Sequence, residues 1–90
     1  MHNVYMITYD LRRPNQDYKG LYEALRNFAG WCHGVDSTWF VSTQLNAEQI
    51  RSYLQPHLDR DDRLIVTRVG RDGAWQGLQA DAGQWLQNNL

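Results

Sequence analysis

Cysteine is almost absent from this sequence, since Cys32 is the only one in 90 residues. A single cysteine excludes a disulfide within the chain and a zinc site built from several cysteines. Long apolar runs are missing as well, because no stretch approaches the roughly 20 apolar residues that cross a membrane. Charged side chains occur early, at Asp10, Arg12 and Arg13, which argues against a signal peptide or an anchor. We therefore expect a reducing, cytoplasmic location and no membrane partner.

An excess of positive charge is also lacking, since nine basic residues face ten acidic ones and the formal net charge is −1. This excludes a strongly basic domain that attracts nucleic acid over its whole surface, so any nucleic-acid contact must be local. All cationic side chains except Lys19 are arginines, whose planar guanidinium groups suit fixed, two-pronged contacts with phosphate or carboxylate. The composition is thus compatible with a few specific phosphate contacts.

What the sequence does contain is typical of one small folded domain. Hydrophobic residues make up 42% of the chain and charged residues 21%, as in ordinary globular proteins. A chain of 90 residues is too short for two domains of the usual size, and its thin core would gain stability from self-association. We therefore expect one domain and a homodimer.

The chain begins with the pattern of a strand followed by a helix. Residues 3–9 are β-branched and aromatic, with apolar side chains on both faces, which predicts a central strand that stops at Asp10. After a turn, we expect Asn15 or Asp17 to cap a helix that stops at Gly30. The helix is predicted by an apolar stripe at the i, i+3, i+4, i+7 spacing, formed by Tyr18, Leu21, Tyr22, Leu25 and Phe28.

Two further strands and a second helix follow. The strands are predicted at residues 31–35 and 38–43, with a tight connection between them, and the alternative is one long bent strand. The helix is predicted to open at Asn46, because Gln49 stands three residues later and completes a capping-box pattern. Pro56 removes a backbone donor and should end the regular helix at the preceding residue. Its apolar stripe consists of Ile50, Tyr53, Leu54 and Leu58.

A last strand at residues 63–69 completes the order strand, helix, strand, strand, helix, strand. This order predicts the α+β ferredoxin-like fold (βαββαβ), in which two helices cover one face of a four-stranded antiparallel sheet. We expect residues 1–73 to form this domain. Residues 74–90 should form a C-terminal packing or dimer arm, with a short edge strand and a final helical turn or two.

The predicted sheet carries more large side chains than we expect two short helices to cover. The other face should then pair with a second subunit or lie under the C-terminal arm. The side chains concerned are Tyr5, Ile7, Tyr9, Trp39, Val41, Ile65 and Val69.

Asp10 is the strongest candidate for a catalytic and metal-binding residue. A carboxylate at the end of a central strand is held rigidly at the rim of the sheet, where it can meet a metal, a substrate or its own symmetry mate. Arg12 and Arg13 follow at once and are candidates for nucleic-acid binding, so the neighbourhood suits a phosphodiester. The alternative is that Asp10 is an ordinary turn or capping residue, as such loops commonly contain.

One carboxylate is too few to bind Mg²⁺ well, and a dimer would solve this. The ion prefers six oxygen ligands and usually takes one or two carboxylates together with water and phosphate. Two Asp10 side chains facing each other across a two-fold axis could hold one Mg²⁺, which would lower the pKa of a bound water. Without metal, the two carboxylates should repel each other and loosen the interface.

The other side chains that could bind phosphate or act in catalysis are better explained by structural roles. Arg60 and Arg63 alternate with aspartates in residues 59–62, which is typical of a solvated loop that neutralises itself. His33 and His57 are more often packed or surface residues than general bases, and Cys32 is best explained as a buried thiol. Arg68 and Arg71 complete the set of possible phosphate contacts.

The sequence resembles a known family in several segments. These are Tyr9-Asp10 at the end of the first strand, residues 36–41 (Asp-Ser-Thr-Trp-Phe-Val), residues 46–50 at the start of the second helix, and residues 62–66 after the acidic loop. Together they look like the small CRISPR-associated protein of the adaptation complex, described as an endoribonuclease, to which the VapD toxin ribonucleases are related. The resemblance covers about the first seventy residues in element order and spacing.

This resemblance implies a ferredoxin-like homodimer with Asp10 as the metal-binding catalytic residue at the dimer axis. It also implies Mg²⁺-dependent cleavage of RNA or DNA in some members, and in others a structural bridge to an integrase-like or antitoxin-like protein partner. The chain has Thr38-Trp39-Phe40 where the family usually has Ser-Val-Phe, and its sequence after Gly73 differs from a typical strand-exchanging end.

Three hypotheses follow for the function. The first is a dimeric Mg²⁺-dependent nuclease, in which paired Asp10 carboxylates hold the metal while Arg12 and Arg13 position phosphate. The second is a non-catalytic dimeric scaffold that binds nucleic acid or a protein partner, which the near-zero net charge favours. The third, binding of a small molecule, rests on fold analogy alone.

Overall fold

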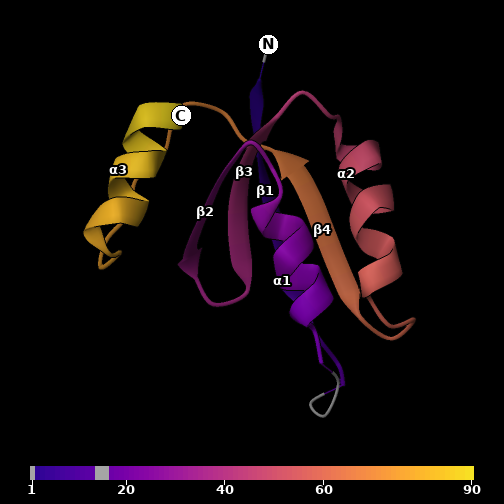
Figure 1. Cartoon of the computed structure of the whole chain (residues 1–90). Coiled ribbons are helices and arrows are strands. Elements are labelled where there is room, and N and C mark those ends of the chain that lie inside the picture. Colours follow the sequence, from indigo (N-terminus) through magenta and orange to yellow (C-terminus); the bar gives the residue numbers. More distant parts are fainter. Residues whose placement is uncertain (1, 14–16) are drawn as a thin grey trace.

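Four antiparallel strands form one sheet, in the order β2-β3-β1-β4 (Figure 1). The structure is a computed structural model that describes residues 2–13 and 17–90. Three α-helices and one short 3₁₀ helix complete it. The elements are β1 (Asn3–Asp10), α1 (Lys19–Arg26), β2 (Gly30–Val35), β3 (Thr38–Thr43), α2 (Ala47–Leu54), η1 (Gln55–His57), β4 (Arg63–Arg68) and α3 (Ala80–Asn89). The expected α+β class is confirmed, and the strand order is compatible with a ferredoxin-like arrangement.

β1 lies in the middle of the sheet and pairs antiparallel with both β3 and β4. The register places Thr8 opposite Thr38 on one side and Ile65 on the other. At the end of the strand, Asp10 stands opposite Arg63, the first residue of β4. β1 is therefore the central strand that its composition predicts.

The large side chains of β1 and β3 lie under the helices. Tyr5, Ile7, Tyr9, Trp39 and Val41 are all buried, with exposures between 0% and 8%. They share one face because they alternate along their strands, and they pack against fully buried side chains of α1 and α2. The expectation that two short helices could not cover them is wrong for these five. The covering residues are Leu21, Leu25, Ile50 and Leu54.

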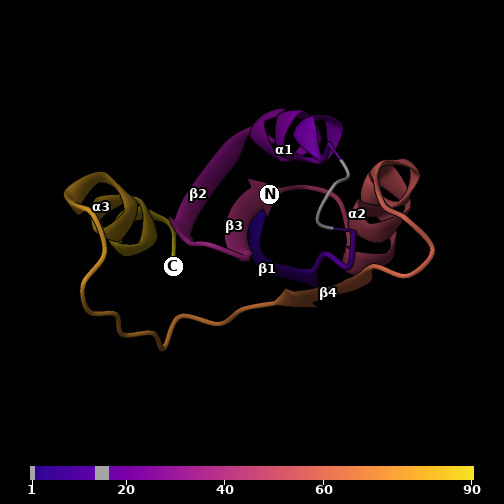
Figure 2. The same cartoon turned by 90° about the horizontal axis from the view of Figure 1, so that it is seen from below.

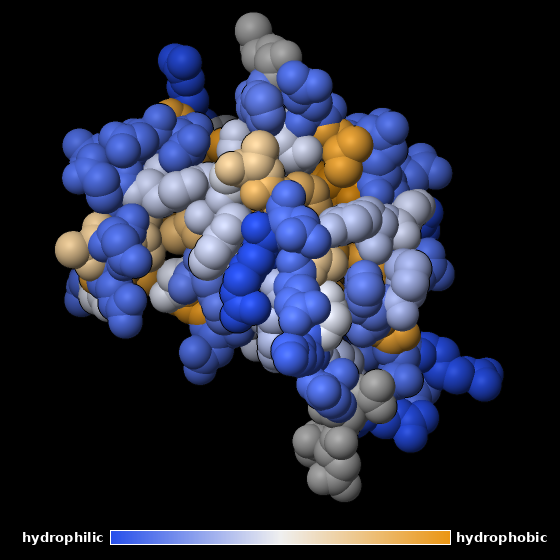
Figure 3. All heavy atoms as spheres, in the orientation of Figure 1, coloured by the Kyte–Doolittle hydropathy of each residue, from blue (hydrophilic) through white to orange (hydrophobic). Residues whose placement is uncertain are grey.

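The opposite side of the sheet is less covered, and we call it the open face. It consists of Met6, Thr8, Phe40, Ile65 and Thr67, which the strand register places on the same side. Ile65 is 59% exposed, so this large apolar side chain meets solvent. Figure 3 views the molecule from the side of α1, where the surface over that helix is mostly hydrophilic.

The C-terminal residues lie along the β2 and β3 part of the open face and leave Ile65 of β4 exposed. Figure 2 shows the chain after β4 crossing below the sheet, on the side opposite α1, before α3 packs beside β2. Gly30 and Gly34 in β2 lie next to Trp85 of α3 and to Leu78, since a Cβ built at either glycine would be in ordinary van der Waals contact with one of these side chains at 3.4–3.5 Å. Cys32 lies between the two glycines and is buried.

Two expectations for the C-terminal residues and the end of α1 need correction. Ala74 to Gln79 contain no strand, and α3 is a regular helix of ten residues where only a turn or two was expected. α1 ends at Arg26 with Asn27 as its C-cap, so Gly30 opens β2 and does not stop the helix. A Cβ at Gly30 would lie 3.3 Å from the Cβ of Ser42 on β3, which is a tight contact, so the glycine suits its place in the sheet.

Other local signals are confirmed. Asn46 and Gln49 form a reciprocal capping box at the start of α2, and the helix gives way to η1, which contains Pro56. Asp17 is not the N-cap of α1, which is Tyr18 and has no side-chain capping hydrogen bond. The Asp17 carboxylate does accept a hydrogen bond from the Lys19 backbone N–H at 2.9 Å, while Asn15 lies outside the described residues. No helix in the described part of the chain is long and apolar enough to cross a membrane.

Candidate functional site

Asp10 lies at the end of the central strand β1, at the rim of the sheet. Strand alternation places its side chain on the same face as Thr8 and Met6, which is the open face. The carboxylate side chain is 53% exposed. Its rigid base and accessible carboxylate match the placement that the sequence predicts.

Arg12 lies next to Asp10 and is already engaged with it. Nη1 of Arg12 donates a hydrogen bond to Oδ2 of Asp10 at 3.0 Å, and both side chains are about half exposed. An exposed ion pair of this kind contributes little to stability, so a metal ion or a phosphate could exchange with either partner at small cost. The structure therefore brings these two predicted site residues together as an ion pair.

Arg13 is engaged as well, with a partner that the sequence interpretation did not assign to it. Its Nη2 lies 3.0 Å from Oδ2 of Asp61, which belongs to the acidic loop at residues 59–62. The two residues are 48 positions apart, and the pairing of β1 with β4 brings them together. We expected the loop aspartates to neutralise Arg60 and Arg63, and this is wrong for Asp61, which neutralises Arg13.

Asp62 holds the loop after β1 in place. Its carboxylate accepts a hydrogen bond from the backbone N–H of Arg12 at 2.7 Å and another from the Tyr18 hydroxyl at 2.9 Å. A third comes from the backbone N–H of Asp59 at 2.8 Å. Asp62 thereby ties the start of β4 to the segment that carries Arg12, so it positions the site without taking part in it.

The sequence interpretation missed this role of Asp62, although a signal was present. In an antiparallel pair that sets Asp10 opposite Arg63, the residue before Arg63 must lie beside the residues that follow Asp10. A carboxylate at that point meets backbone N–H groups that the strand no longer satisfies.

The surroundings of Asp62 favour its ionised form. Partial burial by itself acts to raise the pKa of the Asp62 carboxyl group. The backbone N–H groups of Arg12 and Asp59 act in the opposite direction, because they stabilise the carboxylate. The Tyr18 hydroxyl and the charge of Arg13 add to this, so the pKa of Asp62 is lowered overall. Burial and the neighbouring carboxylate raise the pKa of Tyr18, which therefore stays a neutral donor.

A metal ion at this rim would need ligands from outside one chain. Among residues 2–13 and 17–90, no three His, Cys, Asp or Glu side chains are placed together to hold a metal. Asp10 supplies one carboxylate at the open face, and a second copy facing it would supply another. Two carboxylates with water and phosphate suit the oxygen preference of Mg²⁺.

His33 and His57 are exposed, and each ring lies against a neighbouring residue. The ring of His33 stacks on Trp39 with the centroids 4.1 Å apart, and its Nε2 lies 2.9 Å from the backbone oxygen of Asp36. His57 lies in η1 with its ring close to Gly20. Burial raises the pKa of the Cys32 thiol, with the charge of Asp81 adding to the effect, which suits the inert thiol expected from the sequence.

Family models and solved structures were compared with the chain. No protein-family model matches the chain, and the search of solved structures gives no significant match. Function therefore has to follow from the chemistry of the residues around Asp10.

Proposed function

We propose that this protein is a dimeric, Mg²⁺-dependent nuclease of ferredoxin-like fold, in which Asp10 from each of two copies holds the metal. RNA is the preferred substrate and DNA the second choice, as the resemblance to the CRISPR-associated endoribonucleases suggests. One observation carries the proposal: the Asp10 carboxylate lies at the end of the central strand, on the open face, and is 53% exposed. A carboxylate placed there can meet its symmetry mate.

The open face supports pairing with a second copy. Ile65 is 59% exposed and lies on this face together with the half-buried Met6 and Phe40. Apolar surface of this kind is commonly covered by a partner, and a two-fold axis places the same residues of both copies opposite each other. Asp10 lies at the rim of the same face, so an axis near it brings the two carboxylates together.

The residues around Asp10 have separate roles in binding metal and phosphate. Bound Mg²⁺ would activate a water and offset negative charge on the phosphate. Arg12, whose guanidinium group lies 3.0 Å from Asp10, neutralises the carboxylate and would be available to position phosphate if Asp10 held Mg²⁺ instead. In the metal-free dimer, the same ion pair limits the repulsion between the two Asp10 side chains. Asp62 holds the backbone of Arg12 throughout.

The second candidate is a non-catalytic dimeric scaffold that binds nucleic acid or a protein partner of integrase-like or antitoxin-like kind. The observation in its favour is that Arg12 and Arg13 are both paired with carboxylates. With their charges neutralised, this end of the molecule has little net attraction for a polyanion.

Cleavage assays distinguish the two candidates. Single- and double-stranded RNA and DNA are incubated with wild type and with Asp10→Asn, each in Mg²⁺ and in EDTA. We expect cleavage of RNA that needs Mg²⁺ and falls at least about 100-fold in Asp10→Asn, because a metal ligand is lost while size and shape are kept.

The matched control is Asp81→Asn, the same change at an exposed aspartate in the first turn of α3. This variant should cleave within about twofold of wild type. Metal-dependent activity that survives in Asp10→Asn would refute the assignment, and an inactive wild type that still forms a dimer would favour the scaffold.

A further inference from the structure

The sheet ends in two edge strands, β2 and β4, which differ in how they are protected. β2 pairs irregularly with β3, with a register shift between Cys32 and Val35, and α3 packs against it. β4 pairs with β1 without a shift over its six residues, from Arg63 to Arg68. Irregular pairing is a common way to keep an edge strand from pairing further, and β4 lacks it.

The backbone groups that face outward from β4 can be assigned from one hydrogen bond. The Val69 N–H donates to the Val4 carbonyl at 3.0 Å, so Val69 turns its backbone groups toward β1. In an antiparallel pair, residues that bond to the neighbouring strand alternate with residues that face away from it. Leu64, Val66 and Arg68 therefore turn their N–H and C=O groups away from β1. Within the described residues no strand pairs with that side of β4, so it offers unpaired donors and acceptors.

A hollow of about 540 Å³ lies along this edge, and we call it the edge groove. α2 packs against β4 and lies along its outer side in both Figure 1 and Figure 2. Successive strand residues point to opposite faces of a sheet, so a hollow lined by three in a row lies at the edge of the strand and not on one face. The strand contributes Leu64, Ile65 and Val66, and the helix contributes Ala47, Glu48 and Arg51.

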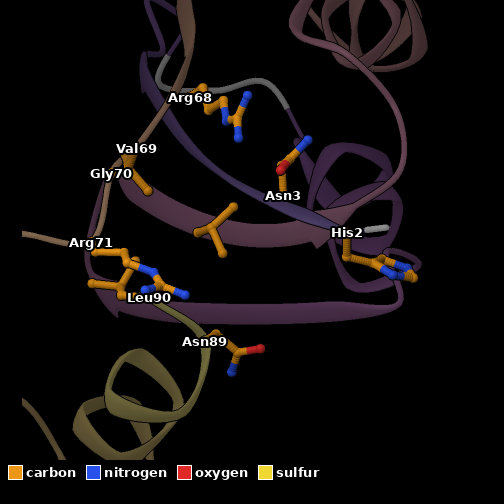
Figure 4. A pocket seen from close by; sticks show the side chains of 9 residues that line it. His2, Asn3, Arg68, Val69, Gly70, Arg71, Asn89 and Leu90 are labelled. Carbon is orange, nitrogen blue, oxygen red and sulfur yellow. The ribbon is translucent and has the colours of Figure 1, made fainter.

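Arg68, at the end of β4, carries the unbalanced charge beside the edge groove. Glu48 is paired with Arg51 at 4.0 Å, and at the start of β4 Arg63 stands opposite Asp10. Arg68 forms no salt bridge with any described residue. The side chains that Figure 4 labels around it include no acidic one. An acidic side chain therefore suits the end of the groove next to Arg68.

We propose that the edge groove binds an extended segment of a partner protein, which adds a strand antiparallel to β4 and places an acidic side chain opposite Arg68. The outward N–H and C=O groups of β4 supply the main-chain hydrogen bonds, and the groove takes alternate side chains of the segment. This site uses neither Asp10 nor cleavage, so Asp10→Asn should bind the segment as wild type does.

A single strand fits this edge better than a second copy of the chain. A two-fold axis that joins two β4 strands antiparallel runs perpendicular to the sheet. Both α2 helices would then lie on the same side of the joined sheet. Because each lies along the outer side of its own β4, the two helices would compete for the same space.

Fluorescence anisotropy in EDTA tests the proposal with a labelled peptide, Ser-Glu-Thr-Val-Val-Val-Thr-Ser, blocked at both ends. In the proposed register its Glu stands opposite Arg68, and the N–H groups of its first and third Val face β4. N-methylation of these two amides should weaken binding at least about tenfold, because two hydrogen bonds are lost. N-methylation of the first Thr and the second Val, whose N–H groups face away, is the matched control and should change the affinity less than about twofold.

Arg68→Glu tests the preference for an acidic side chain. It should weaken binding of this peptide at least about threefold and favour a peptide with Lys in place of the Glu. Lys19→Glu makes the same change of charge at the first residue of α1, which does not line the edge groove, and should leave both affinities within about twofold. Circular dichroism checks that each variant is folded.

Amide hydrogen exchange followed by NMR locates the bound strand. Saturating peptide should slow exchange at Leu64, Val66 and Arg68 at least about tenfold and leave Ile65 and Thr67, already bonded to β1, unchanged. The proposal is overturned if no peptide binds, if the two N-methylated peptides bind alike, or if other amides are protected instead. It is also overturned if the same three amides become protected without peptide as the protein concentration rises, since a second copy would then occupy the edge.

Discussion

The arginines at the two ends of the sheet differ in whether they form ion pairs. Where β1 ends, Arg12 and Arg13 each lie 3.0 Å from a carboxylate. Where β4 ends, Arg68 and Arg71 line a hollow and form no salt bridge with any described residue. An arginine that is already paired must exchange partners before it binds phosphate, and a free one need not. The cation that stands closest to the candidate catalytic residue is therefore not the one most available to a ligand.

The largest effect on folding is expected from removal of the Asp62 carboxylate. Asp62→Asn should lower the free energy of unfolding by about 1–2 kcal/mol at pH 7, because three hydrogen bonds to a half-buried carboxylate are weakened. The folded-state pKa of Asp62 is lowered, so its contribution is complete above the unfolded value of about 3.9 and is lost as the pH falls through the folded pKa.

Urea denaturation between pH 7 and pH 2 measures this effect. The stabilities of wild type and Asp62→Asn should converge at the acid end of the series. Asp61→Asn is the control, since its exposed ion pair with Arg13 should contribute less than about 0.5 kcal/mol. Equal losses in the two variants would mean that Asp62 does not hold the loop.

A smaller effect is expected on the salt dependence of RNA binding. For single-stranded RNA in EDTA, the slope of log affinity against log salt should decrease by about 1.4 in Arg68→Gln, Arg71→Gln, since each lost phosphate contact removes about 0.7. Arg12→Gln, Arg13→Gln should change the slope by less than about 0.7, because those guanidinium groups are already paired. Fluorescence anisotropy at four salt concentrations gives both slopes. Equal changes in the two double variants would contradict the expected difference between the two ends of the sheet.

The sequence was a good guide wherever a few neighbouring residues decide the structure. The capping box of Asn46 and Gln49 and the break at Pro56 are local, and both were predicted correctly. The position of Asp10 at a strand end follows from the composition of residues 3–9 in the same way.

The sequence was a poor guide wherever distant segments meet. The pairing of Arg13 with Asp61 and the role of Asp62 depend on the register of β1 against β4, which no local pattern specifies. The face that each apolar side chain takes depends on the same register. Ile65 stands opposite Thr8 and so falls on the open face, whereas Val66 stands opposite Ile7 and packs against the core.

The central claim is that two Asp10 carboxylates share one metal ion. Isothermal titration of Mg²⁺ into wild type and Asp10→Asn, with the molar mass from light scattering in parallel, tests it most directly. The account predicts a dimer that binds one Mg²⁺ for every two chains, and no such binding in Asp10→Asn. One Mg²⁺ for each chain, or binding that Asp10→Asn leaves unchanged, would contradict it.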